Sequence, residues 1–249
     1  MQPVGPQMAA DYVEARMILP RLSRKSGYGR RRRLFELFGS DRYSHLAHHD
    51  LDRKLAKYLD YRSGTFIEVG ANDGLNQSNT YWFERFRSWH GVLIEAVPEK
   101  AEECRRNRPR AQVFCNALVA DSRTTSVRMR AANLMAYVAG SFEDPAVEST
   151  HLSDAIREQN LASVTDIEVP ARTLASIIEE CGLTKTDLFS LDVEGYELDV
   201  LKGLHVERHR PRYILVETKK LTSVLDILQP HYAVLDKLSH HDYLLQATP

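Results

Sequence analysis

The chain has 249 residues and a formal net charge of −1, with 43% hydrophobic and 27% charged residues. This length allows one well-buried α/β domain with an appendage, and the near-neutral charge gives no global indication of nucleic-acid binding. No apolar run approaches the ~20 residues that a membrane-spanning helix needs.

The cysteines and the start of the chain indicate the compartment. Cys104, Cys115 and Cys181 are odd in number and unrelated in spacing, which favours free thiols over a disulfide framework or a zinc site. The first residues lack the basic-then-apolar layout of a secretory signal. Together these features predict a cytoplasmic protein.

Residues 1–55 are predicted to form a basic, helical N-terminal extension, with the main domain over residues 56–249. Arg21 to Arg33 contains seven Lys or Arg residues and no acid, and the apolar stretch Leu34–Phe38 follows it directly. One interpretation is a patch for an anionic substrate or a membrane surface. The other is a solvated helical face on a mobile arm.

The most informative segment follows at Phe66–Gly74. A strand is expected over 65–70, then a glycine turn, then a helix over 78–88. The spacing is acid-x-Gly-x-x-x-Gly, and Asn72 stands where a dinucleotide fingerprint has its middle glycine. The pattern is instead the one used for S-adenosylmethionine, although glycines can also serve turn geometry alone. The predicted cofactor residues here are Glu68, Gly70, Asn72, Asp73, Gly74, Ser78 and Asn79.

The next two strands are expected to complete the cofactor site. The strand over 91–95 ends in Glu95, whose carboxylate can accept hydrogen bonds from ribose hydroxyls. Alternatively, Glu95 is an N-terminal acid for the helix expected over 98–107. A third strand, 112–118, is expected to place Asn116 or Ala117 beside the adenine.

Residues 126–130 are a further strand candidate, and residues 133–165 are predicted to be an insertion over the site. Long insertions in compact domains are commonly lids or binding loops.

A third polar strand end follows. Helices are expected over 173–182 and 196–204, on either side of a strand at 187–192. Asp192, Glu194 and Glu197 fall within six residues at its end. Charged groups at such a place usually have a partner or a function, although Glu197 is explained by the dipole of the following helix.

The chain ends with a strand over 212–217, a helix over 221–229 and a hairpin. Alternating strands and helices predict an α/β fold with a mostly parallel sheet and helices on both faces. The hairpin surrounds the polar turn Ser239–Asp242, which contains His240 and His241.

Six segments together resemble the FkbM family of S-adenosylmethionine-dependent methyltransferases. They are FIEVGANDG with the following SNT, LIEAVPE, FCNALVAD, VPARTLASIIEECGL, DLFSLDVEGYELDVLKGL and YILVE, in order from about residue 63 to residue 218. The resemblance implies a Rossmann-like class I methyltransferase fold, with seven strands and a C-terminal antiparallel hairpin. It also implies methyl transfer to a hydroxyl of a sugar or natural-product scaffold.

Methyl transfer to a hydroxyl requires a group that removes its proton, a metal, or both. The candidates at the strand ends are Asp192, Glu217, His240 and His241. Asp192, Glu194 and Glu217 could instead bind Mg²⁺, which prefers oxygen ligands. Without a metal, Asp192 would contact the cofactor.

Other functional classes remain open. A non-catalytic protein that binds the cofactor or a glycan is one alternative, although such a protein would be expected to lose the glycine turn or Asp192. A nicotinamide-dependent reductase is disfavoured by Asn72 and by the absence of Tyr-x-x-x-Lys after the fourth strand. The partner is expected to be a small-molecule or glycan acceptor, with no nucleic acid, and a homo-oligomer is left open.

Overall fold

The computed structural model describes residues 27–142, 144–161 and 163–249. The chain forms two compact units, Met1–His45 and Leu46–Pro249. Residues 1–26, the first half of the predicted basic extension, lie outside the described residues. The second unit begins ahead of the expected boundary at residue 56, because Leu51 and Leu55 are buried in its core.

The described part of the first unit is one helix with a return segment. Helix α2 (Tyr28–Leu37) precedes a chain of turns. The Tyr28 hydroxyl donates to the backbone carbonyl of Tyr43 over 3.1 Å, and Phe35 meets the Tyr43 ring edge to face. These contacts fix which face of α2 turns toward residues 40–45.

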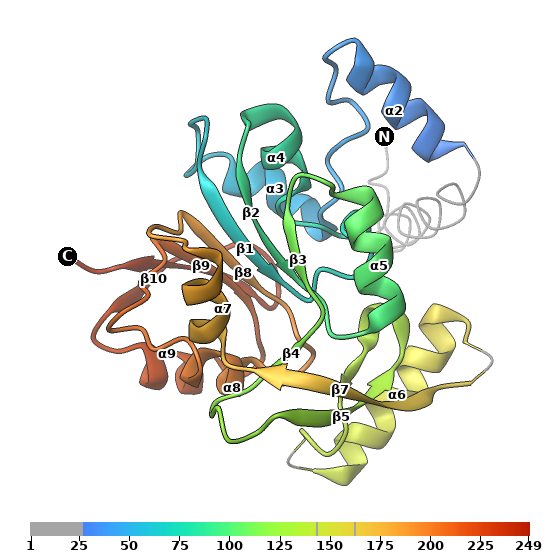
Figure 1. The fold of residues 1–249 in the computed structure, drawn as a ribbon, viewed down its shortest axis with the longest axis vertical. Coiled ribbons are helices and arrows are strands. Elements are labelled where there is room, and N and C mark those ends of the chain that lie inside the picture. Colours follow the sequence, from blue (N-terminus) through green and yellow to red (C-terminus); the bar gives the residue numbers. More distant parts are fainter. Residues whose placement is uncertain (1–26, 143, 162) are drawn as a thin grey trace, which may run out of the picture. The chain divides into compact units, whose positions relative to one another are not determined.

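The second unit is built on a seven-stranded sheet with the order β10-β11-β9-β8-β1-β2-β3 (Figure 1). Five strands are parallel, and β11 runs antiparallel to both β9 and β10. The strands are β1 (Thr65–Val69), β2 (His90–Ile94), β3 (Gln112–Phe114), β8 (Leu188–Leu191), β9 (Tyr213–Glu217), β10 (Tyr232–Lys237) and β11 (Asp242–Ala247). This topology confirms the predicted sheet and its C-terminal antiparallel hairpin.

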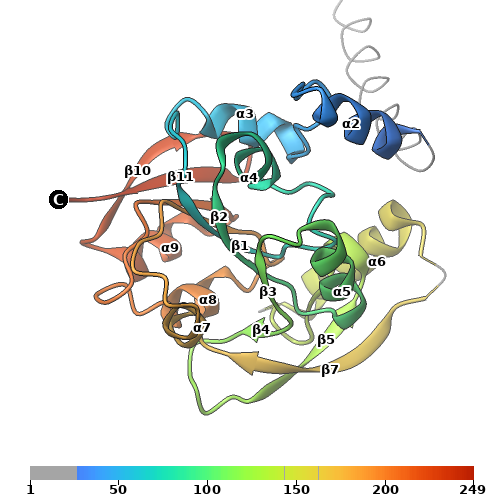
Figure 2. The same ribbon diagram turned by 45° about the horizontal axis from the view of Figure 1, so that its top comes forward.

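Helices cover both faces of this sheet, as the near-continuous apolar strands require. One core contains α3 (Leu51–Leu55), α4 (Tyr81–Arg87) and α5 (Pro98–Asn107), and the other contains α7 (Leu174–Cys181), α8 (Glu197–Lys202) and α9 (Leu221–Leu228). Figure 2 shows α3 and α4 on one side of the strands and α7 to α9 on the other. Along β1, Phe66 enters the first core, whereas Ile67 and Val69 enter the second. The alternation turns Glu68 toward the side of α4 and α5.

A second, smaller sheet has the order β4-β7-β5-β6. Its strands are β4 (Ala117–Leu118), β5 (Ser126–Ala131), β6 (Tyr137–Val138) and β7 (Thr165–Arg172), with the short helix η2 (Asn133–Met135) and α6 (Pro145–Gln159) between them. The strand predicted over 112–118 is wrong in its continuity, because it divides at Cys115–Asn116 and its second part pairs with β7. Helix α6 occupies much of the predicted insertion, which the sequence did not assign to a helix.

No helix in the described ranges is long and apolar enough to cross a membrane.

Candidate active site

The glycine turn lies where the strand order of the main sheet reverses, between β1 and β8. Gly70 has a φ of +81°, and a Cβ added there would lie 1.9 Å from the backbone oxygen of Asp192. Only glycine fits this position, because the two strand ends touch through their backbones. A substitution at Gly70 would therefore disturb the fold of the turn itself, in addition to any effect on ligand binding. Reversal points of this kind are where parallel sheets bind ligands.

The rest of the turn is fixed by its own polar groups. Asn72 also has a positive φ, of 48°, and its side-chain oxygen accepts from the backbone N–H of Asp73 over 2.8 Å. The Asp73 carboxylate in turn accepts from the N–H groups of Leu75 and Asn76. The Asn107 amide donates to the Asp73 carbonyl over 2.8 Å. The turn is thus held in shape before any ligand arrives.

Glu68 anchors the segment that follows the turn. Its carboxylate accepts from the Ser78 hydroxyl over 2.9 Å, from the Asn79 backbone N–H over 2.7 Å, and from the Thr80 hydroxyl. The Asn79 side chain donates to the Ser190 hydroxyl of β8 over 3.0 Å. Glu68, Ser78 and Asn79 were predicted to contact the cofactor. The structure places all three in an internal network, where they position the turn.

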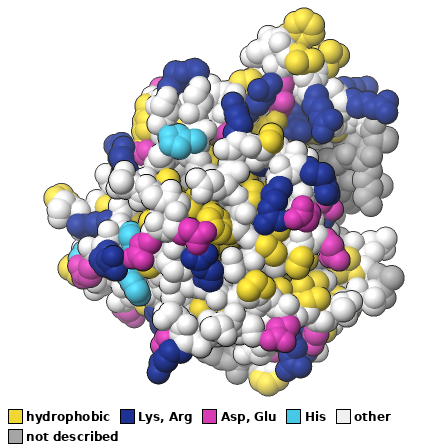
Figure 3. Space-filling view, in the orientation of Figure 1, with side chains coloured by type: hydrophobic (Ala, Val, Ile, Leu, Met, Phe, Trp, Pro, Cys, Tyr) yellow, Lys and Arg dark blue, Asp and Glu magenta, His cyan; other side chains and the backbone are white. Residues whose placement is uncertain are grey.

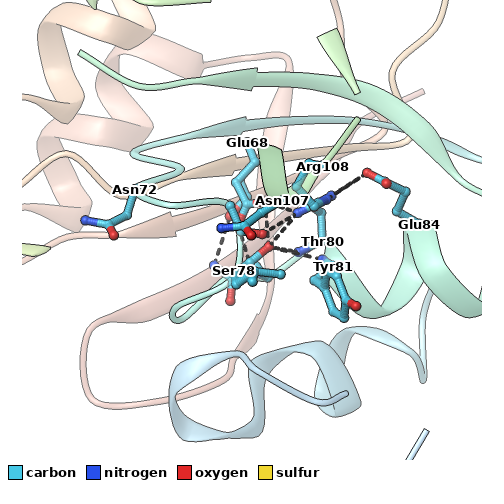
Figure 4. A network of polar contacts seen from close by, with 12 residues as sticks. Glu68, Asn72, Ser78, Thr80, Tyr81, Glu84, Asn107 and Arg108 are labelled. Atoms are coloured by element: carbon cyan, nitrogen blue, oxygen red, sulfur yellow. Dashed lines mark hydrogen bonds and ion pairs between the residues drawn. The ribbon is translucent and has the colours of Figure 1, made fainter. Parts of the chain in front are cut away.

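Arg108, which follows α5, completes this network (Figure 4). Its guanidinium is fully buried and lies 2.8 Å from the Glu84 carboxylate and 3.8 Å from that of Glu68. It also donates to the Gly74 carbonyl over 3.0 Å and to the Ser78 hydroxyl over 3.1 Å. One cation therefore neutralises two buried carboxylates and holds the end of the glycine turn.

Gly74 is required by packing inside the protein. Its φ is +76°, and an added Cβ would lie 2.8 Å from Cγ of Arg108 and 2.9 Å from the Cys104 thiol. The glycine allows α5 to pack closely against the turn.

Glu95 lies at the end of β2 beside the glycine turn. One carboxylate oxygen accepts from the Asn72 backbone N–H and the other from the Val97 backbone N–H, each over 2.8 Å. Burial raises the pKa of Glu95, and these two backbone hydrogen bonds oppose the shift. Each oxygen retains a further acceptor site. The carboxylate is thus oriented by the turn and can still accept hydroxyl donors.

Asn116 and Ala117 lie at the break between β3 and β4. The Asn116 amide is half-buried and donates to the Pro170 carbonyl of β7 over 3.4 Å. Ala117 is buried in the small core of the second sheet. Both residues therefore connect the two sheets at the end of the third strand.

A group of carboxylates gathers at the ends of β8 and β9. Burial and the Glu217 carboxylate raise the pKa of Asp192 well above its ordinary value. The Glu217 side chain is partly exposed to solvent, but nearby protein displaces some of its hydration water, which raises its pKa. The negative charges of Asp242 and Glu197 raise the pKa further. The pKa of Glu217 rises from 4.5 to about 7. Two neighbouring carboxylates repel each other, which disfavours ionisation of both at once.

Glu194 lies beside this pair with a positive φ of 49°. Burial, followed by the Glu217 and Glu197 carboxylates, raises its pKa from 4.5 to about 7. Glu197 accepts from the Gly195 backbone N–H over 2.7 Å, as an acid in the first turn of α8. Within the described ranges, no three His, Cys, Asp or Glu side chains converge to hold a metal ion. Asp192, Glu194 and Glu217 therefore do not form a preorganised Mg²⁺ site.

The histidine that lies beside these carboxylates, His151, was not predicted from the sequence. His151 of α6 places Nδ1 3.9 Å from a Glu194 carboxylate oxygen, and its Nε2 lies 3.2 Å from the Met135 carbonyl. A carbonyl only accepts hydrogen bonds, so Nε2 carries the hydrogen and Nδ1 is left as a base. Burial lowers the pKa of His151 and favours this neutral form. The insertion thus places an imidazole at the carboxylates.

His240 and His241 lie elsewhere along the same edge. Both are exposed in the β10–β11 turn. His240 lines a pocket of about 610 Å³ together with His49, Asp50, Lys54, Lys237 and Ser239. The His241 backbone carbonyl accepts from the Thr218 N–H over 2.8 Å, which ties this turn to the end of β9.

A glycine turn at the reversal point, with an acid at the end of the next strand, defines a class I methyltransferase fold. The family follows from comparison with known proteins. Residues 68–245 match the methyltransferase FkbM domain, and the chain therefore belongs to the FkbM methyltransferase family. The predicted family is confirmed. No curated protein matches the chain.

Among solved structures, methyltransferase FkbM from Methylobacillus flagellatus KT is 15% identical, with 86% of this chain and 52% of that chain covered and a TM-score of 0.48. This chain spans about half the length of that protein. A putative caffeoyl-CoA O-methyltransferase from Staphylococcus aureus is 10% identical, with 96% and 100% covered and a TM-score of 0.41. A TehB-like SAM-dependent methyltransferase from Corynebacterium glutamicum ATCC 13032 Kitasato is 10% identical, with 88% and 94% covered and a TM-score of 0.40.

The network makes Arg108 far more important to stability than its neighbour Arg110. Arg108→Gln removes the buried cation that lies between the Glu68 and Glu84 carboxylates, which we expect to cost about 3–5 kcal/mol in the free energy of unfolding. Arg110 also pairs with Glu84, at 3.6 Å, but is exposed, so Arg110→Gln is expected to cost about 0–1 kcal/mol. Urea unfolding of both variants measures the difference. Equal, small losses would show that the buried pairs do not hold the turn.

Proposed function

We propose that the protein is an S-adenosylmethionine-dependent O-methyltransferase whose acceptor is a small molecule or glycan with a free hydroxyl. The observation that carries the proposal is Glu95, held by the backbone N–H groups of Asn72 and Val97 beside a preformed glycine turn. Membership of the FkbM methyltransferase family supports the reaction class.

The residues at the turn fit the polar groups of this cofactor. Glu95 has free acceptor sites for the two ribose hydroxyls. The backbones of Gly70 and Asp192 meet at the reversal point, where the ammonium and the carboxylate of the cofactor would lie. Asn116 and Ala117 stand at the end of the third strand, which suits the adenine. When bound, S-adenosylmethionine supplies an electrophilic methyl group that needs no further activation.

The protein's own contribution is to hold the acceptor and remove its proton. The pKa values of Asp192 and Glu217 are both raised, and that of Glu217 is about 7, so a carboxylate of this pair can accept a proton near neutral pH. We assign this role to Glu217, because its side chain is exposed and a methyl acceptor can therefore reach it. His151 and Glu194 are the neighbouring groups that can pass the proton on to solvent.

The cofactor assignment makes a direct prediction for Glu95. Glu95→Ala is expected to weaken S-adenosylmethionine binding by about 1–3 kcal/mol, because a charged hydrogen-bond partner is lost. Glu99→Ala, an exposed acid in the first turn of α5, should leave the affinity unchanged. Isothermal titration calorimetry measures both variants, with thermal melting as a check on folding. An affinity in Glu95→Ala equal to the wild type would remove Glu95 from the site.

The pH dependence tests the base. The raised pKa of Glu217 means that the carboxyl is protonated below about pH 7 and ionises above it, so turnover should rise as the pH increases through this range. Asp192→Asn and Glu217→Gln should each lower turnover by about 10²–10⁴-fold, while S-adenosylmethionine still binds to Glu217→Gln. Glu207→Gln, an exposed acid beyond α8, is the matched control.

Methyl transfer to a panel of hydroxylated sugars and natural-product scaffolds, followed by mass spectrometry, provides the assay. Full turnover in both variants would exclude the pair from catalysis. Loss of activity with EDTA that Mg²⁺ restores would replace the proton-transfer role with a metal-binding role. Cofactor binding without transfer to any acceptor would favour the non-catalytic alternative.

A further inference from the structure

The outward face of α2 has an unusual composition. Leu34, Leu37 and Phe38 have exposed fractions of 52%, 77% and 83%. A surface helix normally turns its apolar residues inward and its charged residues outward. Here the large apolar side chains face solvent.

The opposite face explains why the helix cannot simply rotate. Glu36 is buried, accepts from the Ser44 hydroxyl over 2.8 Å and lies 3.8 Å from the Arg32 guanidinium, which is also buried. Tyr28 and Phe35 both pack against Tyr43. Turning the leucines inward would break these contacts and bring buried charges to the surface without their partners.

Arginines share the outward face with the leucines. Arg30, Arg33, Leu34 and Leu37 are spaced at i, i+3, i+4 and i+7, so they form one stripe along the helix. Arg31 and Phe38 flank the stripe, and all six residues are exposed. We call these six residues the basic-apolar face: Arg30, Arg31, Arg33, Leu34, Leu37 and Phe38. Figure 3 shows dark blue and yellow side chains next to one another over α2.

The chemistry of this face selects its partner. The acid of the helix, Glu36, is buried on the other face, so no acid of α2 itself compensates the arginines of this face. A nucleic acid would satisfy the arginines but not the leucines and the phenylalanine. The headgroup layer of an anionic membrane offers phosphates for the first group and an apolar boundary for the second.

We propose that the basic-apolar face binds the surface of an anionic lipid bilayer. The apolar residues enter the boundary between headgroups and acyl chains, and the arginines lie at the lipid phosphates. The protein lies on the membrane and does not span it. This binding is independent of methyl transfer.

Co-sedimentation of the full chain with vesicles tests the proposal. The vesicles contain phosphatidylcholine alone or with about 30% phosphatidylglycerol. We expect binding to the anionic vesicles, weakening as salt is added, and much weaker binding to the neutral vesicles. The combined variant Arg30→Gln, Arg31→Gln and Arg33→Gln should lower the partition coefficient on the order of 100-fold, because each arginine near the surface contributes separately.

Two further variants test whether binding depends on the residues of the basic-apolar face or only on the total positive charge of the protein. Leu37→Ser with Phe38→Ser should also lose binding, since these substitutions remove the apolar anchor but no charge. Arg53→Gln with Arg106→Gln and Arg123→Gln removes the same charge from exposed positions elsewhere and should bind like the wild type. Circular dichroism and thermal melting establish that each variant is folded.

The proposal is overturned if the wild type does not bind anionic vesicles, or if the three α2 arginine substitutions act no more strongly than the matched set. Equal binding to neutral vesicles would overturn the charge argument. Self-association that Leu37→Ser with Phe38→Ser abolishes, in the absence of vesicle binding, would assign the face to a second copy of this chain instead.

Discussion

The buried guanidinium of Arg108 is the interaction on which the cofactor end of the sheet depends. It lies between the Glu84 and Glu68 carboxylates and also donates to the Gly74 carbonyl. Three buried charges carry a large desolvation cost, which is offset only when every hydrogen-bonding group has a partner. That requirement fixes α4, the end of α5 and the glycine turn relative to β1. The position of Glu95 follows, because the turn supplies one of the N–H groups that orient it.

The acids near the glycine turn and the acids at the ends of β8 and β9 have different electrostatic surroundings. Glu68 and Glu84 have a cation and remain part of the scaffold. Asp192 and Glu217 have each other and further carboxylates, so their pKa values rise. Acids that are buried among like charges are the ones that exchange protons near neutral pH. Glu68 and Glu84 therefore stabilise the structure of the site, whereas Asp192 and Glu217 have the raised pKa values that proton exchange requires.

Much of this could be predicted from the sequence, because the signals were local. The apolar strands, the glycine turn and the acids at the strand ends gave the main sheet and its binding edge. Arg108 could not be predicted, since it follows a helix and resembles an ordinary C-terminal cation. The position of His151 was equally hidden, because it depends on how α6 packs over Glu194. Strand β7 was not predicted, because its exposed face is mostly polar. The hydrogen bond between Glu68 and Ser78 could not be predicted for the same reason, since spacing does not reveal which groups bond to each other.

We infer that the internal network preforms the glycine turn and leaves Glu95 and the adjoining backbone to receive S-adenosylmethionine. Backbone amide NMR of the wild-type protein during a titration with S-adenosylmethionine tests it most directly. We expect saturable shifts at the amides of Asn72 and Val97, which donate to Glu95, and much smaller shifts at the Asn79 amide, which donates to Glu68. A titration without saturable shifts, or one in which Asn79 moves while Asn72 and Val97 do not, would contradict it.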